Sequence, residues 1–227
     1  MPKVNLTIDG KQIEAEAGEK LLWAALDNGI YIPHLCAGRG EAEPQASCRI
    51  CFVEIEGRGE PAVSCNETVR DGMIVRTKTE AVTALVRSAF DLLMSTHPVN
   101  CEACPGNNRC ALQEIAAKMK FKLKSKRLPE ILPSYKIDDS HPDFSFDANR
   151  CAHCGKCVHA CNEEAGAEAI DFIRRGLATK VGAFEDGPIA ESRCISCFRC
   201  VEVCPVKAFY FKALISSVID CNSNFKP

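Results

Sequence analysis

The chain has 227 residues, of which 46% are hydrophobic and 26% are charged, a composition that excludes a disordered or fibrous protein. A formal net charge of −2 argues against nucleic acid as a partner. No apolar run reaches the roughly 18–20 residues that a transmembrane helix needs, so we expect no membrane-spanning segment. The sixteen cysteines are far above average usage and are the most informative feature of the sequence.

Cysteines at this density predict either a disulfide framework or metal sites, and the cellular compartment decides between the two. The chain runs from Met1 directly into the alternating segment 4–8, without the apolar stretch, cleavage site or twin arginine of an export signal. We therefore expect a cytoplasmic protein whose thiols stay reduced and are free to bind metal.

Residues 1–78 predict a β-grasp sheet with one helix. Segments 4–8 and 12–15 alternate apolar and polar residues, and the Asp-Gly pair between them predicts a two-residue hairpin turn. Residues 19–28 carry apolar side chains at helical spacing, and residues 51–55 predict a later strand.

Residues 79–120 predict a small all-helical module. Its first helix covers residues 79–96, has one apolar face, and ends before the His97-Pro98 pair because a proline disfavours helix in the residue before it. A cysteine loop separates this helix from a second one that begins at Ala111. Residues 121–149 contain prolines and few periodic apolar positions, which predicts a connector.

The segment 118–124 alternates basic and apolar residues, and two interpretations of it stay open. In the first, the segment is an exposed edge with Met119, Phe121 and Leu123 turned inward. In the second, it is a docking strip for an acidic partner.

Residues 150–212 contain a tandem repeat, which predicts a pseudo-two-fold βαββαβ unit like that of bacterial ferredoxins. The stretch between its two cysteine runs is long for that fold, and we expect an extra strand and turn near residues 169–176. The tail 213–227 carries the leftover Cys221, which we expect to be a free thiol. The predicted fold class of the whole chain is α+β.

The tandem repeat consists of two C-x2-C-x2-C-x3-C runs. They are Cys151, Cys154, Cys157 and Cys161, and then Cys194, Cys197, Cys200 and Cys204. Two-residue gaps let a tight loop present three sulfurs to a [4Fe–4S] cube, and in two-cluster ferredoxins the fourth cysteine of each run serves the other cluster. We therefore expect one cube on Cys151, Cys154, Cys157 and Cys204, and the other on Cys194, Cys197, Cys200 and Cys161.

Two details bear on this interpretation. Asn162 stands where a proline commonly follows the fourth cysteine, which alters the backbone beside Cys161 but leaves ligation the expectation. A structural zinc site needs C-x2-C pairs separated by a longer stretch, a pattern that three evenly spaced cysteines followed by a fourth do not match.

Two further groups lie upstream. The first is C-x11-C-x2-C-x13-C, formed by Cys36, Cys48, Cys51 and Cys65, and it lacks the C-x4-C-x2-C spacing of plant-type ferredoxins. The second is H-x3-C-x2-C-x5-C, formed by His97, Cys101, Cys104 and Cys110. Taken alone, a histidine before a proline is usually a turn residue.

The first group resembles the [2Fe–2S] domain of the large iron–sulfur subunit of respiratory complex I and related dehydrogenases, with Ile32-Pro33-His34-Leu35-Cys36 as the entry into its ligand loop. The second resembles the [4Fe–4S] module of the same superfamily that uses one histidine and three cysteines. The resemblance implies a [2Fe–2S] cluster on the first group and a histidine-ligated [4Fe–4S] cluster on the second, since three cysteines alone would leave one iron without a protein ligand. We expect His34 to lie beside the ligands rather than among them.

The order of these sites resembles the N-terminal region of [FeFe]-hydrogenases, of NAD-dependent formate dehydrogenase α-subunits and of the complex I large subunit, and the diaphorase-side subunit of NAD(P)-reducing [NiFe]-hydrogenases. In the first two a catalytic domain follows, whereas this chain stops soon after Cys204. The resemblance therefore implies a stand-alone, non-catalytic electron-transfer subunit with one [2Fe–2S] and three [4Fe–4S] clusters.

The sequence also carries no G-x-G-x-x-G nucleotide motif. We therefore expect FMN and NAD(P) on a partner subunit, and a hydrogenase or formate dehydrogenase catalytic subunit at the other end of the relay. The alternatives are a free-standing polyferredoxin, a complex I-type subunit and a zinc structural adaptor.

Overall fold

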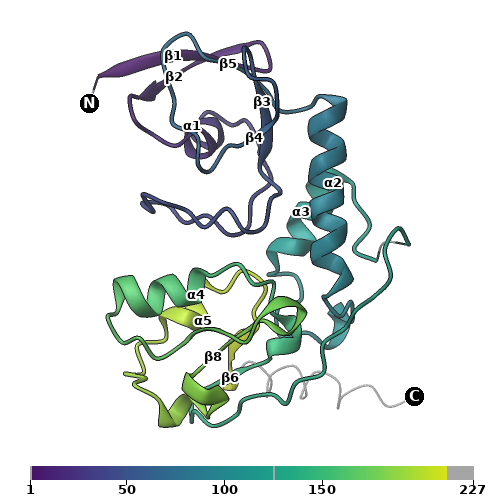
Figure 1. Cartoon of the computed structure of the whole chain (residues 1–227), viewed down its shortest axis with the longest axis vertical. Coiled ribbons are helices and arrows are strands. Elements are labelled where there is room, and N and C mark those ends of the chain that lie inside the picture. Colours follow the sequence, from purple (N-terminus) through teal and green to yellow (C-terminus); the bar gives the residue numbers. More distant parts are fainter. Residues whose placement is uncertain (1, 125, 214–227) are drawn as a thin grey trace. The chain divides into compact units, whose positions relative to one another are not determined.

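The computed structural model describes residues 2–124 and 126–213 (Figure 1). Within these residues the chain is mixed α and β, with one five-stranded sheet and two two-stranded sheets. The described part forms two compact units. One contains the residues up to Leu93 together with Lys118–Phe121, and the other contains Met94–Ala117 and the residues from Lys122 onward. Cys221 lies outside the described residues.

The first unit is built on the five-stranded sheet, whose strand order is β2-β1-β5-β3-β4. Its strands are β1 (Lys3–Ile8), β2 (Lys11–Glu16), β3 (Phe52–Ile55), β4 (Ala62–Val63) and β5 (Ile74–Arg76). The β1–β2 hairpin is antiparallel, and both Asp9 and Gly10 in its turn have positive φ angles. Such φ angles suit the tight Asp-Gly turn that the sequence predicts, and the hairpin is confirmed.

A single apolar core holds this unit together. Helix α1 (Leu21–Asp27) lies beside the strands of this sheet (Figure 1). It buries Leu21, Leu22, Ala24 and Ala25. They pack in one cluster with the inward-facing sheet residues Leu6 and Ile8. The loops that carry the first four cysteines start and end at this core, so the sheet and α1 fix where those cysteines lie.

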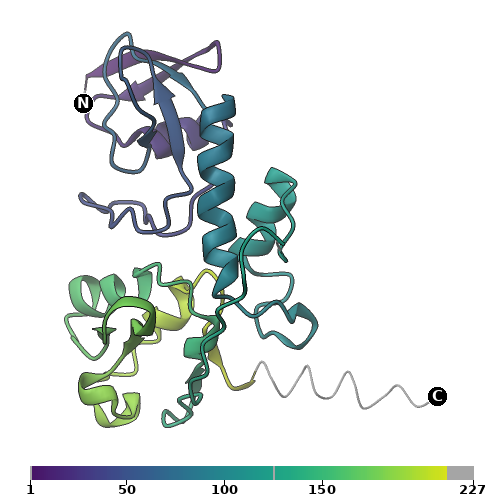
Figure 2. The same cartoon turned by 45° about the vertical axis from the view of Figure 1, so that its right-hand side comes forward.

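Helix α2 (Glu80–Ser95) is a single unbroken helix (Figure 2). The side-chain hydroxyl of Thr79 accepts a hydrogen bond from the backbone N–H of Val82, which caps the helix start. Buried side chains follow at steps of four, at Val82, Val86, Phe90 and Met94. The predicted helix is confirmed, but its buried stripe is narrower than expected, because Leu92 is 61% exposed.

The segment 118–124 begins in the last turn of helix α3 (Ala111–Met119), and its burial alternates as the sequence predicts. Its lysines are exposed, whereas Met119, Phe121 and Leu123 are half-buried. The Phe121 ring lies 5.5 Å from the ring of Phe90. The inward-turned interpretation is therefore confirmed for the apolar residues, and docking of an acidic partner stays a prediction.

In the second unit, residues 144–211 follow the order strand, helix, strand, strand, helix, strand. The elements are β6 (Phe144–Phe146), α4 (Lys156–His159), β7 (Asp171–Ile173), β8 (Lys180–Gly182), α5 (Arg199–Val203) and β9 (Phe209–Phe211). Strands β6 and β9 pair antiparallel, as do β7 and β8. The extra strand predicted near residues 169–176 is present as β7. Strand β6 lies inside the segment 121–149 that the sequence predicts as a connector, and all three of its residues are buried.

Short helical turns complete the second unit. They are the 3₁₀ turns Cys101–Ala103, Ala148–Arg150, Gly176–Ala178, Phe184–Asp186 and Ile189–Glu191, and the π turn Ala160–Glu164. No helix within residues 2–124 and 126–213 is both long enough and apolar enough to cross a bilayer.

A matched pair of leucine substitutions tests the position of the core. Leu22 is fully buried and Leu92 is 61% exposed, so we expect Leu22→Ala to destabilise the protein by about 2–5 kcal/mol. Leu92→Ala should change stability by no more than about 0.5 kcal/mol. The measurement is thermal unfolding of anaerobically purified protein at one fixed scan rate. Equal losses in both variants would show that the core is misplaced.

Candidate iron–sulfur sites

The four N-terminal cysteines come together from separate loops. Cys36 and Cys48 lie before β3 with their Sγ atoms 3.3 Å apart, Cys51 immediately precedes β3, and Cys65 follows β4. All four side chains are buried. The pKa of Cys65 responds to Cys51, Cys36 and Cys48, so the four sulfurs form one group.

Mutual hydrogen bonds favour thiolates within this group. A hydrogen bond with Cys48 lowers the pKa of Cys36, and a hydrogen bond with Cys65 lowers the pKa of Cys51. The same hydrogen bonds raise the pKa values of the partner thiols Cys48 and Cys65, because each of these thiols keeps the proton that the two sulfurs share. Thiolates are the form that binds metal, so half of the ligand set is already disposed to bind.

His34 lies outside this sulfur group. Its Nδ1 is 3.1 Å from the backbone carbonyl of Ile32, and its ring stands edge-on to Trp23 with the ring centroids 5.3 Å apart. These contacts place the imidazole beside the entry to the Cys36 loop.

The second group surrounds the loop between α2 and α3. Cys101 opens the turn Cys101–Ala103, Cys104 follows it, and the carbonyl of Cys110 accepts the first hydrogen bond of α3, from Glu114. The pKa of Cys110 is raised, mainly by burial and to a smaller degree by Cys104 and Cys101, so the three thiols lie close together.

His97 carries an unpartnered buried nitrogen. Its Nδ1 is buried and makes no hydrogen bond within the described part of the chain. Burial and, to a smaller degree, the positive charge of Arg150 lower the pKa of His97 to about 4, while Asp147 acts in the opposite sense. A neutral imidazole with an unpaired nitrogen is the form that ligates a metal, so His97 fits the predicted role.

The tandem cysteines gather in crossed sets. The pKa of Cys157 is raised by burial, then by Cys151, Cys154 and Cys204, and least by Cys200, although Cys204 and Cys200 belong to the other run. In the same way, the pKa of Cys200 responds to Cys194, Cys197 and Cys161. Phe144, Ile170, Ile189, Phe198 and Phe209 line a cavity together with Cys161, Cys194, Cys197 and Cys200. A cavity enclosed by four thiols and apolar side chains fits a cube, and the ligand assignment stays a prediction.

Backbone donors already point at several of these sulfurs. Ala208 donates its N–H to Cys204 Sγ at 3.2 Å, Ala169 donates to Cys161 Sγ at 3.3 Å, and His153 donates to Cys151 Sγ at 3.4 Å. Hydrogen bonds to sulfur are one of the means by which proteins tune such sites.

The sites differ in their access to solvent. Among the described cysteines Cys197 is exposed, and the neighbouring Ile195 is 60% exposed. Within residues 2–124 and 126–213, no three His, Cys, Asp or Glu side chains converge as a single metal ion would need. A [4Fe–4S] cube takes one protein ligand on each of its four irons, and its ligands are therefore spread around it.

Two polar groups around these sites carry no signal in the sequence. His141 is 4% exposed, stacks on Phe144 with ring centroids 4.1 Å apart, and places Nε2 3.0 Å from the Ser196 hydroxyl, between Cys194 and Cys197. The second group is the ion pair of Arg150 with Asp147. Neither His141 nor the Arg150–Asp147 pair belongs to a periodic sequence pattern. The one sequence feature that could have drawn attention to the pair is that Arg150 directly precedes a cysteine run.

Comparison with known proteins gives three family matches. Residues 1–80 match the "2Fe-2S iron-sulfur cluster binding domain", residues 87–123 the "NADH-ubiquinone oxidoreductase-G iron-sulfur binding region", and residues 150–208 the "4Fe-4S dicluster domain". Together they cover all four cysteine groups.

Three curated relatives match most of the length of this chain. The chain is 37% identical to a NADH-quinone oxidoreductase component of Rhizobium meliloti over 90% of this chain and 24% of the relative. It is 35% identical to the alpha subunit of the NADPH-Fe(3+) oxidoreductase of Geobacter sulfurreducens over 89% of this chain and 23% of the relative. It is 32% identical to the HndD subunit of the NADP-reducing hydrogenase of Solidesulfovibrio fructosivorans over 99% of this chain and 39% of the relative. The chain thus spans well under half the length of these relatives.

One solved structure matches nearly end to end. A chain in the crystal structure of NAD⁺-reducing [NiFe]-hydrogenase in the H₂-reduced state has 34% sequence identity and a TM-score of 0.82. The match covers 92% of this chain and 88% of that one.

Replacing His97 tests the second site. We expect His97→Ala to remove or alter one cluster signal in the electron paramagnetic resonance (EPR) spectrum of the reduced protein and to leave the other three, because one iron loses its only protein ligand there. His34→Ala is the control and should leave all four signals. Four unchanged spectra in the His97 variant would remove that residue from the ligand set.

Replacing Cys204 tests whether this residue ligates the cube of the first cysteine run rather than that of its own run. We expect Cys204→Ser to disturb the cube assigned to Cys151, Cys154 and Cys157 and to spare the cube assigned to Cys194, Cys197 and Cys200. Cys221→Ser is the matched control and should change no signal. A loss confined to the cube of Cys194, Cys197 and Cys200 would contradict crossed ligation.

Proposed function

We propose that this chain, which belongs to the family of iron–sulfur proteins that includes the matched chain of NAD⁺-reducing [NiFe]-hydrogenase, is a non-catalytic electron-relay subunit. It carries single electrons between a flavin subunit that oxidises NAD(P)H and the catalytic subunit of a hydrogenase or formate dehydrogenase. The observation that carries this proposal is the near end-to-end match to a chain that is itself part of a hydrogenase structure.

In this proposal the chain holds one [2Fe–2S] cluster on Cys36, Cys48, Cys51 and Cys65. It holds three [4Fe–4S] clusters: one on His97, Cys101, Cys104 and Cys110, one on Cys151, Cys154, Cys157 and Cys204, and one on Cys194, Cys197, Cys200 and Cys161. When bound, each cluster supplies reversible one-electron chemistry. FMN and NAD(P) belong to the partner subunit.

The residues of the chain supply three things to such sites. Thiols provide the ligands, and burial raises the pKa of both Cys151 and Cys200 to about 12 and so limits the access of water to these two thiols. The backbone N–H groups of Ala208, Ala169 and His153 donate to ligand sulfurs. A hydrogen bond to sulfur stabilises the added negative charge of the reduced state and so raises the reduction potential.

The finer architecture and setting are part of the same proposal. Residues 1–78 form a β-grasp domain, 79–120 a histidine-ligated helical module, 121–149 the connecting segment, and 150–212 a bacterial-ferredoxin-like domain. The protein acts in the cytoplasm and does not bind nucleic acid.

A second function is favoured by one observation. Residues 87–123 match the iron–sulfur region of the NADH-ubiquinone oxidoreductase-G family, which supports a complex I-type subunit as the alternative. A free-standing polyferredoxin is the third candidate, and the exposure of Cys197 suits a transient partner as well as a permanent one.

Anaerobic gel filtration of a native extract tests this proposal. We expect the chain to elute in an assembly much larger than its own 24.8 kDa, together with a flavin-containing subunit and a second redox subunit identified by mass spectrometry. The chain itself should be brown and contain about fourteen irons, the sum over the proposed clusters.

The alternatives give different results in the same experiment. Elution as a monomer would overturn the subunit role and favour the polyferredoxin. Co-purification with quinone-reducing membrane subunits would favour the complex I-type role. A colourless protein that holds zinc would overturn electron transfer altogether.

A further inference from the structure

A buried ion pair lies at the start of the tandem cysteine region. Arg150 Nε donates to Asp147 Oδ2 at 3.0 Å, and the two side chains are only 12% and 9% exposed. Arg150 directly precedes Cys151, a predicted ligand of the first cube. Charges held away from water interact strongly with other charges nearby, because solvent screens them poorly.

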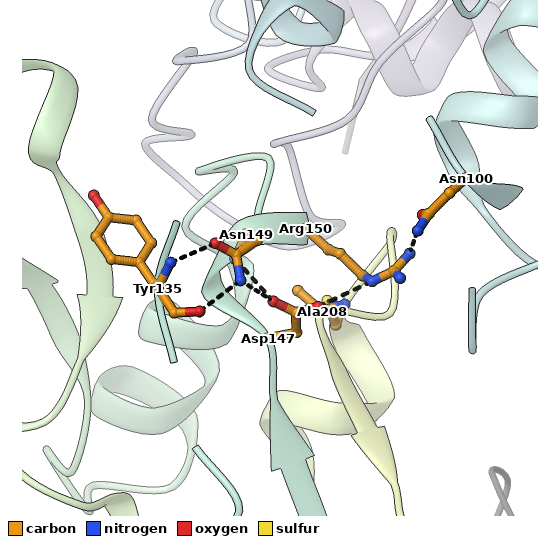
Figure 3. A network of polar contacts seen from close by, with 7 residues as sticks. Asn100, Tyr135, Asp147, Asn149, Arg150 and Ala208 are labelled. Carbon is orange, nitrogen blue, oxygen red and sulfur yellow. Dashed lines mark hydrogen bonds and ion pairs between the residues drawn. The ribbon is translucent and has the colours of Figure 1, made fainter. Parts of the chain in front are cut away.

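Arg150 also reaches the His97 group. Its Nη1 donates to the side-chain carbonyl of Asn100 at 3.0 Å, and Asn100 directly precedes Cys101 (Figure 3). One guanidinium therefore contacts the ligand loops of two predicted clusters.

Asp147 is joined through Ala208 to Cys204, a predicted ligand of the first cube. Its backbone N–H donates to the carbonyl of Ala208 at 2.9 Å (Figure 3). The N–H of Ala208 in turn donates to Cys204 Sγ at 3.2 Å. Its carboxylate accepts from the backbone N–H of Asn149 at 3.0 Å and from the side-chain amide of Asn149 at 2.8 Å. These bonds hold the carboxylate in one position.

The framework around Asp147 and Arg150 is itself well anchored. The Asn149 side chain bridges the backbone of Tyr135, accepting from its N–H at 2.7 Å and donating to its carbonyl at 2.9 Å (Figure 3). A separate bond, from Ala111 N–H to the carbonyl of Pro205 at 2.9 Å, joins the residues that follow Cys110 and Cys204. The two ligand sets are thus neighbours in the second unit.

We propose that Arg150 and Asp147 act as a charge pair that sets the reduction potentials of the His97 site and of the Cys151, Cys154, Cys157 and Cys204 site, with Arg150 raising both and Asp147 lowering both. The inference rests on the proposed electron-relay function. Reduction adds one negative charge to either site, which a buried cation stabilises and a buried carboxylate destabilises. Because the pair acts on two adjacent sites, it changes the driving force for electron transfer between them wherever its effect on one potential is larger than on the other.

The signs distinguish this role from a structural one. Arg150→Gln leaves the Asp147 carboxylate uncompensated, so both potentials should fall. Asp147→Asn leaves the guanidinium uncompensated, so both should rise. If the pair served packing alone, both substitutions would loosen the same contact and would have no reason to shift the potentials in opposite directions.

The experiment is an EPR-monitored redox titration of the complex as isolated, in the wild type and each variant. The chain offers a matched control in Arg199, which directly precedes Cys200 as Arg150 precedes Cys151. Arg199 pairs with Glu164 and Glu202, but its side chain is 46% exposed, so water and salt screen its charge. We expect Arg199→Gln to leave all four potentials unchanged, and the Arg150 and Asp147 variants to move two of the four.

A conservative variant separates the effect of the charge from any loss of clusters that the substitution itself causes. Arg150→Lys keeps the charge without the full set of guanidinium hydrogen bonds, so its potentials should lie closer to the wild type than those of Arg150→Gln. Shifts of the same sign in the Gln and Asn variants, or equal potentials in the Lys and Gln variants, would overturn the proposal. If the wild type holds four clusters and no variant moves their potentials, this inference alone is overturned. If the wild-type protein holds no iron, the proposed function is overturned as well.

Discussion

The rest of the structure depends on the cost of burying sulfur as an anion. Burial raises the pKa of Cys151, Cys157 and Cys200, so without a cation these thiols stay protonated. Each thiolate would also repel the others of its set. Only a strongly positive centre shared by four ligands offsets both the cost of burying the thiolates and the repulsion between them. Metal binding is therefore part of the folding free energy. The short elements fit this dependence, since α4 has four residues and α5 has five, too few to be stable alone.

The predicted crossing of Cys204 and Cys161 would make the folding of the tandem region cooperative. Cys204 lies among the sulfurs of the first run, and Cys161 lies among those of the second. Under the predicted ligation, neither half alone has a complete ligand set. The β6–β9 pairing joins the two ends of the region. Stacking of Phe146 on Phe209, with ring centroids 4.2 Å apart, adds an apolar contact across that pairing. This explains why the region starts at β6, before the first cysteine of the run.

Sequence patterns predicted the features that depend on local spacing and missed those that depend on single polar contacts. The hairpin at Asp9 and the helix α2 follow from turn chemistry and apolar periodicity, and the gathering of cysteines follows from their intervals. Strand β6 has three residues, too short for alternation to be recognised. The bond between Arg150 and Asn100 joins residues fifty positions apart, and nothing in their neighbourhoods marks the pairing. The residues around the clusters were therefore the least predictable part of the sites.

The two kinds of cysteine site differ in what prepares them for metal. In the N-terminal group, hydrogen bonds between thiols lower the pKa of Cys36 and Cys51, so part of the negative charge exists before metal arrives. In the tandem region burial dominates and no such lowering occurs at Cys151 or Cys200. The His97 site is a third case, because burial and the charge of Arg150 keep its imidazole neutral. With His97 as a ligand, as predicted, a neutral imidazole would favour the reduced state of that site more than a fourth thiolate would.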